Sequence, residues 1–496
     1  MSCFPARHLI LPLALLLPAL GCPGSGGSGE DDSGADEVGP QTEDEDTSSE
    51  ASSDTDTAAD TDTAADTEDT GSETGAACDP AALLDGLSLD QSYTEVDYGW
   101  AKVERWVDAN PGFEQEAFFP DARSEQKAQR LEFFAFDPTP HSSELLLYYA
   151  PNFEAALASG RTPVVLAHGA NDNADRAWSD PGESGDFGCG KPECPNEGLM
   201  QALVAAGYPV VAVTMAHSQG DNYYWAEQIH NAIDIVRAQT CELDEPAAQV
   251  DLIGWSKGAF AARMYVSGVR EDWGRAYADD VRKLVLIGGP NLGFDYLFRY
   301  GTAHNLGVWP PNGTIHAPVA HDAQVVGLST IDLSEYAVYE TAAGDYFRGQ
   351  RQMVDMWIDE YPLTAVANNG FGDYAIADSL ATYWGEGDYT GLLARGKGIE
   401  FTIAQGSLVQ TIVEAGTPAS VETFLLCSEL TSPNSYIPGI PNEIAGPSDG
   451  VVFVESCASA EGIGKLGQVA ILEDVNHLEL GWSDLSVETI TGWLGQ

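Results

Sequence analysis

The stretch VDLIGWSKGAFAARM, residues 250–264, decides the fold expected for this chain. It begins with an apolar run typical of a buried strand and ends with small and apolar residues typical of a helix. Between them, Ser256 stands between Gly254 and Gly258. In a strand–turn–helix context such a turn is sharp and strained, and it raises the serine hydroxyl above the carboxyl edge of a sheet. The stretch therefore predicts a nucleophilic serine.

From about residue 145 onward, short apolar strands alternate with helices along the chain. This pattern predicts an α/β fold with a mostly parallel central sheet and helices on both faces. The expected strands are 144–150, 163–169, 209–215, 249–255, 281–289, 399–405 and 468–474. The expected helices are 196–208, 223–240, one that begins near Ser256, and 484–494.

A long stretch without clear strands predicts an inserted cap at about 291–397, because it exceeds the length of a simple connection. Within it, residues 351–361 read RQMVDMWIDEY and place large side chains at helical spacing. Two interpretations stay open, a packed cap helix and an acyl-binding stripe that faces the site. The stripe comprises Met353, Met356, Trp357 and Tyr361, and further aromatic residues that could cover an acyl chain are Phe294, Tyr296, Phe298, Trp309 and Trp384.

A serine hydroxyl is a poor nucleophile unless a base removes its proton, and the base needs an orienting carboxylate. His477 follows the last expected strand, so its loop should open into the same crevice as Ser256. Asp449 lies earlier, in a turn rich in Gly, Pro and Ser, and is the predicted acid, with Asp474 as a weaker rival. The sequence thus predicts a triad of Ser256, Asp449 and His477.

Hydrolysis also needs hydrogen-bond donors for the negative oxygen of the tetrahedral intermediate. The backbone N–H of Lys257, directly after the serine, is one predicted donor. The backbone N–H of Ala170 is the other, because His168 and Gly169 end an early strand at the same sheet edge. The side chain of His168 is expected to be structural.

Together these motifs resemble those of the α/β-hydrolase superfamily, most closely bacterial secreted lipases and esterases. The resemblance covers about 145–496 and implies the roles given above to the triad and to both oxyanion donors. Two positions depart from the family pattern: Trp255 stands where His is usual, and Lys257 where Met, Gln or Leu is usual. The residues that carry the resemblance are HG at 168–169, GWSKG at 254–258, SDGVV at 448–452 and NHL at 476–478.

The N-terminus has the features of an export signal. Arg7 and His8 precede an apolar run from Leu9 to Leu20, which is too short to span a bilayer but fits a secretory signal. The following ALGC, which ends at Cys22, resembles the lipobox of bacterial lipoproteins. That resemblance implies a signal peptide at 1–22 and a lipid on Cys22, with ordinary secretion as the alternative.

Residues 23–77 form an acidic segment with 18 Asp and Glu and no Lys, Arg or aromatic residue. Such a composition cannot bury enough apolar surface to fold, so it predicts a disordered tether before a hydrolase domain at 78–496. The whole chain has a formal net charge of −55, which does not support a nucleic-acid-binding surface.

Six cysteines remain after Cys3 and Cys22, and an even number in an exported chain predicts disulfides, with fifteen possible pairings. Closeness in sequence and elimination favour the pairs Cys189–Cys194, Cys427–Cys457 and Cys78–Cys241. Neither a CxxC pattern nor histidines beside the cysteines occur, so no metal site is expected.

The sequence therefore predicts a secreted or surface-tethered carboxylic ester hydrolase, lipase-like, that works through an acyl-enzyme without a cofactor. Its substrate would be a small-molecule or lipid ester, and its membrane contact would be the N-terminal lipid anchor at the bacterial cell envelope. An extracellular polyester depolymerase with the same triad is the alternative. A surface binding protein on a hydrolase scaffold is disfavoured, because such proteins normally lose a triad member.

Overall fold

The computed structural model describes residues 78–116, 118, 130–182, 189–191, 193–241, 249–299, 321–326, 329–332, 348–363, 383–384, 394–396, 398–438 and 442–496. The chain divides into two units, Met1–Ser72 and Glu73–Gln496, and every described residue lies in the second. The predicted signal peptide and acidic tether therefore lie outside the described residues. Within the described part of the chain, no helix is long and apolar enough to cross a membrane.

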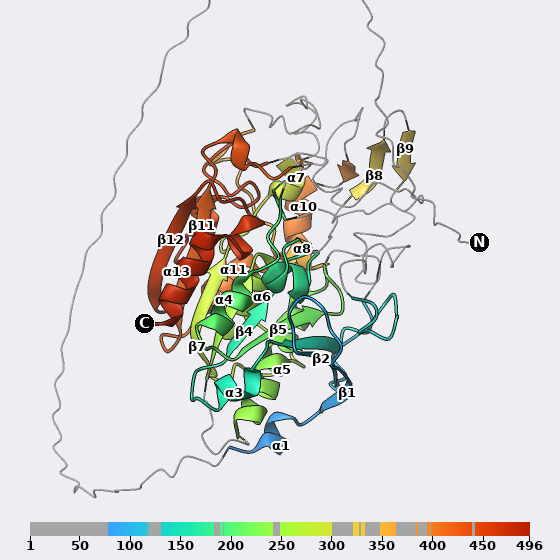
Figure 1. The fold of residues 1–496 in the computed structure, drawn as a ribbon. Helices are drawn as coiled ribbons and strands as arrows, with labels where there is room; N and C mark the ends of the chain where they lie inside the picture. Colours follow the sequence, from blue (N-terminus) through green and yellow to red (C-terminus); the bar gives the residue numbers. More distant parts are fainter. Residues whose placement is uncertain are drawn as a thin grey trace, which may run out of the picture. The chain divides into compact units, whose positions relative to one another are not determined.

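A nine-stranded sheet forms the centre of the described unit, in the order β1-β2-β3-β5-β4-β6-β7-β11-β12 (Figure 1). The strands β5, β4, β6, β7, β11 and β12 pair in parallel, whereas β1, β2, β3 and β5 pair antiparallel. The predicted mostly parallel sheet is confirmed. The strands are β1 (Leu87–Tyr93), β2 (Lys102–Asp108), β3 (Glu144–Tyr149), β4 (Val164–Ala167), β5 (Val210–Met215), β6 (Val250–Trp255), β7 (Val281–Ile287), β11 (Glu422–Glu429) and β12 (Leu466–Glu473).

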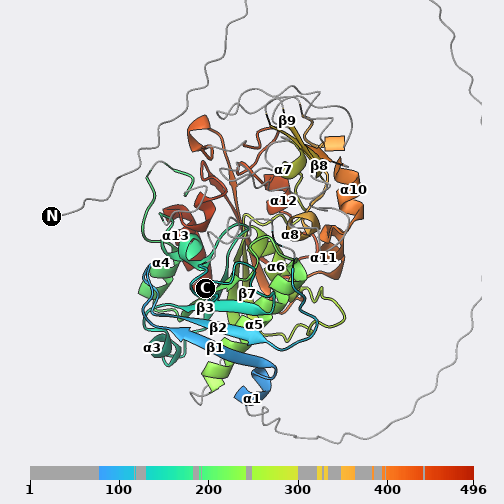
Figure 2. The same cartoon turned by 90° about the vertical axis from the view of Figure 1, so that its right-hand side faces the viewer.

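Helices cover both faces of this sheet, because neighbouring residues of its buried strands point to opposite sides. In β4, Val165 and Ala167 pack with α5 (Asn222–Cys241) and α6 (Lys257–Val266). Val164 and Leu166 pack instead in the core that contains residues of α4 (Leu199–Ala205) and α13 (Asp484–Leu494). Figure 2 shows α4 and α13 on one side of the strands and α6 on the other.

Short elements complete the described unit. Before and within the parallel part lie α1 (Pro80–Leu83), α3 (Phe153–Leu157) and a π-helical turn at Asp175–Ser179. The middle region contains α7 (Tyr296–Arg299), α8 (Arg348–Gln352) and a separate three-stranded sheet of β10 (Ala394–Gly396), β8 (His321–Val326) and β9 (Ser329–Asp332). Towards the C-terminus lie α10 (Gly398–Ala404), α11 (Val409–Ala415), α12 (Val454–Cys457) and 3-10 turns at Pro433–Ser435 and Glu479–Gly481.

The strand predicted at 399–405 is wrong, because these residues form α10. The alternation of Ile399, Phe401 and Ile403 reads as a strand, yet the side chains that become buried are Ile399 and Thr402, three residues apart on one helical face. The next strand of the main sheet is β11, whose central residues are buried on both faces. The middle region therefore joins the sheet later than the sequence predicted.

The predicted cap helix over 351–361 is also not formed. Helix α8 ends at Gln352, and Val354 then forms a parallel bridge with Phe294. The N–H of Phe294 donates to the Met353 carbonyl, and the N–H of Asp355 donates to the Phe294 carbonyl. These tertiary hydrogen bonds take the backbone groups that a continued helix would have used.

Candidate active site

Ser256 lies at the junction of β6 and α6, with φ 55° and ψ −120°. A non-glycine residue at positive φ costs about 1–3 kcal/mol and persists only where its surroundings fix it. A Cβ on Gly254 would come 2.5 Å from the Gly258 carbonyl oxygen, and one on Gly258 would collide with the carbonyl oxygens of Ala167 and His168. Both glycines are therefore required by close backbone contact, and the turn raises Ser256 into partial exposure.

Three predicted side chains from distant parts of the chain form one hydrogen-bonded line. His477 Nε2 lies 2.9 Å from Ser256 Oγ, and His477 Nδ1 lies 2.7 Å from Asp449 Oδ2. Asp449 and His477 are buried, whereas Ser256 is partly accessible. With its proton on Nδ1, held by the carboxylate, His477 presents a free Nε2 that can accept the serine proton.

Asp449 is held by its own turn as well as by the histidine. Its Oδ1 accepts hydrogen bonds from the N–H groups of Val451 at 3.0 Å and Val452 at 2.8 Å. Its backbone carbonyl accepts from the N–H of His477 at 2.8 Å. Asp474, the rival acid, is exposed, and its carboxylate accepts from the backbone N–H of Thr431, a hydrogen bond that lowers the Asp474 pKa. The hydrogen bonds of Asp474 go to the backbone N–H groups of Thr431 and Ser432 rather than to His477.

The turn that carries His477 is fixed by contacts that the sequence analysis did not predict. Asn476 Oδ1 accepts from the N–H of Glu479 at 3.1 Å, and Glu479 Oε2 accepts from the N–H of Asn476 at 3.1 Å. Trp255 Nε1 donates to the His477 carbonyl at 3.1 Å. The pattern Asn-x-x-Glu is a helix-capping signal and could have drawn attention to this turn; nothing in the sequence indicated the contact of Trp255.

Lys257 adjoins Ser256 in the sequence, and Gly169, the neighbour of Ala170, lies close to Ser256 in space. Lys257 is the first residue of α6, where backbone N–H groups have no partner within the helix. Ala170 follows Gly169, and a Cβ on Gly169 would lie 3.2 Å from Ser256 Cβ. The chain after β4 therefore passes directly beside the serine.

His168 is placed in the core, as its expected structural role requires. Its Nδ1 lies 2.7 Å from the Gly169 carbonyl oxygen, and its ring meets Trp225 edge to face at 5.0 Å. Burial lowers the pKa of His168 to about 3, so the ring is neutral at physiological pH.

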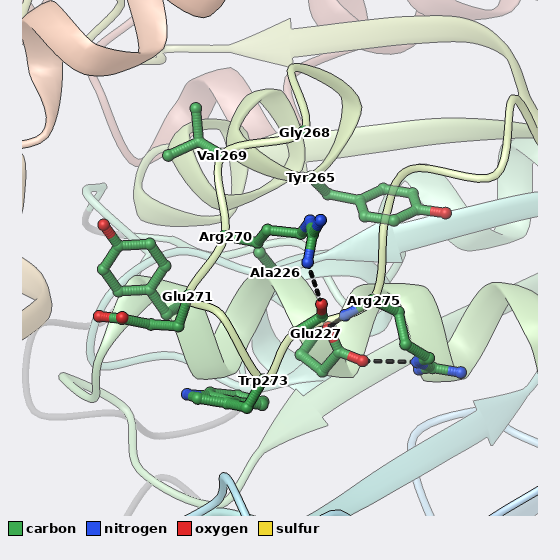
Figure 3. A pocket seen from close by; sticks show the side chains of 11 residues that line it. Ala226, Glu227, Tyr265, Gly268, Val269, Arg270, Glu271, Trp273 and Arg275 are labelled. Atoms are coloured by element: carbon green, nitrogen blue, oxygen red, sulfur yellow. Dashed lines mark hydrogen bonds and ion pairs between the residues drawn. The ribbon is translucent and has the colours of Figure 1, made fainter.

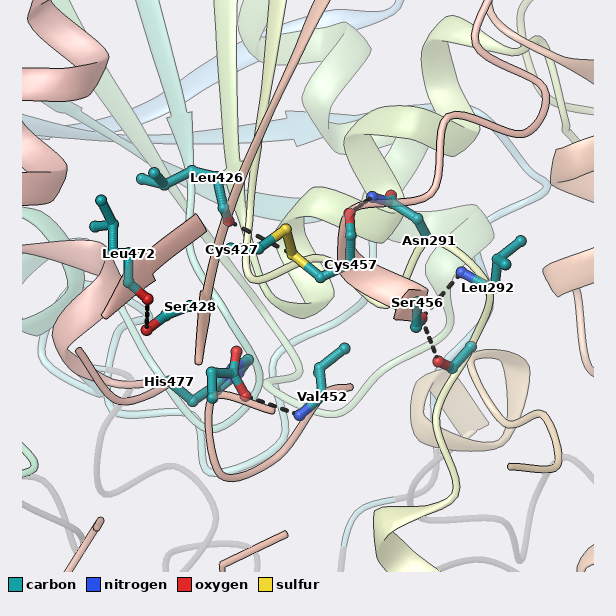
Figure 4. Close-up of a disulfide and its surroundings, with 12 residues drawn as sticks. Asn291, Leu292, Leu426, Cys427, Ser428, Val452, Ser456, Cys457, Leu472 and His477 are labelled. Carbon is teal, nitrogen blue, oxygen red and sulfur yellow. Dashed lines mark hydrogen bonds and ion pairs between the residues drawn. A yellow bond between two sulfur atoms is a disulfide. The ribbon is translucent and has the colours of Figure 1, made fainter. Parts of the chain in front are cut away.

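The structure joins the cysteines in the three pairs expected from the sequence, Cys78–Cys241, Cys189–Cys194 and Cys427–Cys457. Figure 4 shows the last pair linking β11 to α12 in the same region as Val452 and His477. Ser456, beside Cys457, accepts from the N–H of Leu292 and donates to the Gly293 carbonyl at 2.6 Å. This disulfide therefore lies between the acid loop and the chain that leaves β7.

The other disulfide near the site is Cys189–Cys194. Between its cysteines, the Gly190 carbonyl accepts from Asn476 Nδ2 at 3.3 Å. Lys191 Nζ lies 3.1 Å from Glu479 Oε1. The small disulfide loop is thus packed against the turn that presents His477.

A small pocket lies at the ends of α5 and α6, and Figure 3 shows its lining side chains. The pair formed by Glu227 and Arg275 borders it, and Arg270 donates to the Gly274 carbonyl at 2.6 Å. Neither Ser256 nor His477 nor Asp449 lines this pocket, so it has no part in the triad.

In the described residues, the side chains of His230, Asp234 and Asp280 lie close enough together to hold one metal ion. Their carboxylates already have partners: Arg275 Nη1 lies 2.8 Å from Asp234, and Tyr265 donates to Asp280 at 2.8 Å. A cation would have to compete with these groups, so the cluster is a buried ion-pair network.

Comparisons with known proteins give one family match and several similar solved structures. The model of the palmitoyl protein thioesterase family matches residues 163–371, less than half of the chain. No curated protein matches the chain.

Similar solved structures include the lipase BlEst2 of Bacillus licheniformis, with TM-score 0.34 and 12% identity over 67% of this chain and 92% of that chain. The esterase RhEst1 of Rhodococcus sp. has TM-score 0.30 and 14% identity over 71% of this chain and 95% of that chain. The naproxen esterase of Bacillus subtilis has TM-score 0.31 and 9% identity over 71% and 88%.

The mostly parallel sheet, its covering helices and the family match identify the α/β-hydrolase fold. The class that these findings support is a hydrolase with that fold.

Proposed function

We propose that this chain is a serine hydrolase that cleaves acyl esters through Ser256, His477 and Asp449. The observation that carries the proposal is the unbroken line of hydrogen bonds, 2.9 Å from Ser256 Oγ to His477 and 2.7 Å from His477 to Asp449. Ser256 Oγ attacks the acyl carbon while His477 Nε2 takes its proton. The same proton then passes to the leaving group, and a water molecule activated by His477 hydrolyses the acyl-enzyme.

The N–H groups of Ala170 and Lys257 are the proposed donors to the oxyanion. Their support is the position of Lys257 at the first turn of α6 and the close approach of Gly169 to Ser256. Loss of one such donor costs about 2.7–4 kcal/mol of transition-state stabilisation in serine hydrolases.

Two acyl substrates fit this chemistry. A carboxylic, lipase-type ester is the first choice, because the sequence motifs resemble secreted lipases and esterases. A long-chain thioester is the second, because the matching family is named for palmitoyl protein thioesterases. The same triad handles both, since the leaving alkoxide or thiolate accepts its proton from His477 and departs as the alcohol or thiol.

The deciding experiment measures hydrolysis of p-nitrophenyl esters from C2 to C16, with and without micelles, beside thioesters of the same acyl chains. Ester rates above thioester rates at every length favour the first substrate, and the reverse favours the second. Ser256→Ala should abolish both activities and fluorophosphonate labelling. Retained labelling in that variant, or no hydrolysis of either series by the natural chain, would overturn the proposal. Clearing of a polyester emulsion tests the depolymerase alternative.

We also propose that the chain is exported and held at the cell envelope by a lipid on Cys22. Three disulfides in the described residues support an oxidising compartment. Mass spectrometry of the mature N-terminus should find a diacylated Cys22, and Cys22→Ser should release the protein into the medium. An unmodified N-terminus beyond residue 22 would indicate ordinary secretion.

A further inference from the structure

Lys257 has an unusual position for a lysine, directly after the proposed nucleophile and wholly buried. Its Nζ donates to Asn222 Oδ1 at 2.6 Å and lies 3.3 Å from the centre of the Trp225 ring. Burial lowers the pKa of Lys257 well below its usual value, and the charges of Glu116 and Asp221 partly oppose this. A cation at a helix N-terminus also opposes the helix dipole. Such a side chain needs specific partners.

Its partner Asn222 connects Lys257 to α8 of the middle region. Asn222 Nδ2 donates to the Gly349 carbonyl at 2.8 Å, and the Asn222 N–H donates to Gln352 Oε1 at 2.7 Å. Gln352 Nε2 in turn donates to Asp221 Oδ1 at 2.7 Å. Both ends of α8 are thus bonded to the start of α5.

The backbone of α8 also packs on the lysine itself. A Cβ on Gly349 would lie 2.5 Å from Lys257 Cε and 2.9 Å from Nζ, so only glycine leaves room for this approach. The Gly349 N–H donates to the Gln219 carbonyl at 3.1 Å. Helices α6 and α8 lie next to one another in both Figure 1 and Figure 2.

We propose that Lys257 is a positioning residue that holds α8 against the nucleophile turn through Asn222. The contacts among Lys257, Asn222 and Gly349 are called the clamp below. The proposal rests on the proposed function, because it assigns the backbone N–H of the same residue to the oxyanion. One residue then contacts α8 with its side chain and the reacting oxygen with its main chain. Release of α8 should loosen the oxyanion donor without touching Ser256 or His477.

The test compares two variants that break the clamp with one matched control. Lys257→Met keeps the length of the side chain but removes its donor. Asn222→Asp keeps an acceptor for Lys257 but removes the donor to the Gly349 carbonyl. Lys283→Met is the control, because Lys283 is also buried, donates to the Trp493 carbonyl at 2.7 Å and lies near the Phe424 ring, far along the chain from α8.

Hydrogen exchange of residues 348–352 is measured in all four proteins, together with kcat and KM for the best substrate. Both clamp variants should exchange these amides at least about tenfold faster, and Lys257→Met should lower kcat about tenfold or more with a smaller change in KM. The control should change neither. Unchanged protection of 348–352 in both clamp variants, or an equal loss of kcat in Lys283→Met, would overturn the clamp.

The two proposals fail in different ways. If the natural chain hydrolyses no ester or thioester, the proposed function is wrong, while the exchange of 348–352 still decides whether Lys257 holds α8. If hydrolysis is normal but exchange does not respond to Lys257→Met or Asn222→Asp, only the clamp is wrong. If Lys257→Met does not fold, Asn222→Asp decides the clamp alone.

Discussion

Asp449→Asn is the sharpest perturbation of the proposed triad, because it changes one hydrogen bond and preserves two. The asparagine Oδ1 can still accept from the N–H groups of Val451 and Val452, which bond Asp449 at 3.0 and 2.8 Å. Its amide NH₂ would then face His477 Nδ1, where the carboxylate Oδ2 now lies at 2.7 Å. A donor in that place forces the proton of the ring onto Nε2, which can no longer accept from Ser256.

The expected effects on activity and stability differ in size. In a serine protease triad the same change lowers kcat by about 10⁴, or about 5 kcal/mol of activation free energy. The folded state exchanges one hydrogen bond to a charged group, worth about 1.5–3 kcal/mol, for a neutral hydrogen bond worth about 0.5–1.5 kcal/mol. Asp449→Asn should therefore be folded at room temperature and almost inactive.

The assay is hydrolysis of p-nitrophenyl butyrate, with active sites counted by fluorophosphonate burst and the unfolding midpoint measured alongside. Asp474→Asn is the matched control, because Asp474 lies in the neighbouring loop and accepts from the N–H of Thr431 rather than from His477. It should keep full kcat. Asp449→Asn with more than a tenth of the natural kcat, or Asp474→Asn with an equally deep loss, would refute the assignment of the acid.

Three further outcomes can be checked on the purified chain. Gly258→Ala should lower soluble yield and the unfolding midpoint steeply, because its Cβ collides with backbone oxygens at the end of β4. Trp357→Ala should lower the free energy of unfolding by about 3–5 kcal/mol in denaturant titration and reduce all ester rates alike. The reason is that Trp357 is buried and its ring stacks on that of Tyr361 at 6.2 Å. Met356 is more exposed, so Met356→Ala should change the free energy of unfolding by less than about 0.5 kcal/mol. The folded pKa of His168, lowered to about 3, lies below its unfolded value of 6.5, so its contribution to stability is complete above pH 6.5 and is lost as pH falls toward 3. His168→Gln should accordingly show a shallower fall in unfolding free energy over that window, and an equal slope in both proteins would contradict the neutral buried ring.

The candidate site could be predicted where function imposes a local pattern. Two glycines around Ser256 are visible in the sequence because backbone contacts on both sides of the turn exclude any Cβ. His477 and Asp449 could be found because each follows an apolar strand or lies in a turn, and loops at strand ends collect at one sheet edge. These signals depend on residues that are neighbours in the sequence, so they can be recognised without a structure.

The fold was less predictable where tertiary contacts outweigh local preference. Residues 399–405 alternate as a strand would, but they form α10, and the stripe at 351–361 ends its helix at Gln352 to pair with Phe294. Strand β1 carries mainly polar, exposed side chains, so the sequence has no apolar run there from which the strand could be predicted. In each case the deciding partner lies far away in sequence, and its contact energy cannot be read from the segment itself.

The aromatic residues of the middle region show the same limit for function. Phe294, Tyr296 and Phe298 are buried in the core of the described unit, which leaves them no surface for an acyl chain. Trp384 is partly exposed, and Trp309 lies outside the described residues. The aromatic-rich composition of this region predicted a surface that covers the substrate. Several of these aromatic side chains pack in the protein core instead.

The two departures from the family pattern, Trp255 and Lys257, lie on either side of Ser256. Each of their side chains contacts a different part of the chain. Trp255 donates to the His477 carbonyl at 3.1 Å, so it braces the turn that carries the base. Lys257 donates to Asn222 at 2.6 Å and packs under Gly349, so it braces α8. A histidine at 255 or a methionine at 257, each usual in similar hydrolases, would remove one of these contacts and leave the other. The residues that look least regular in the motif are thus those that connect the nucleophile to the particular loops of this chain.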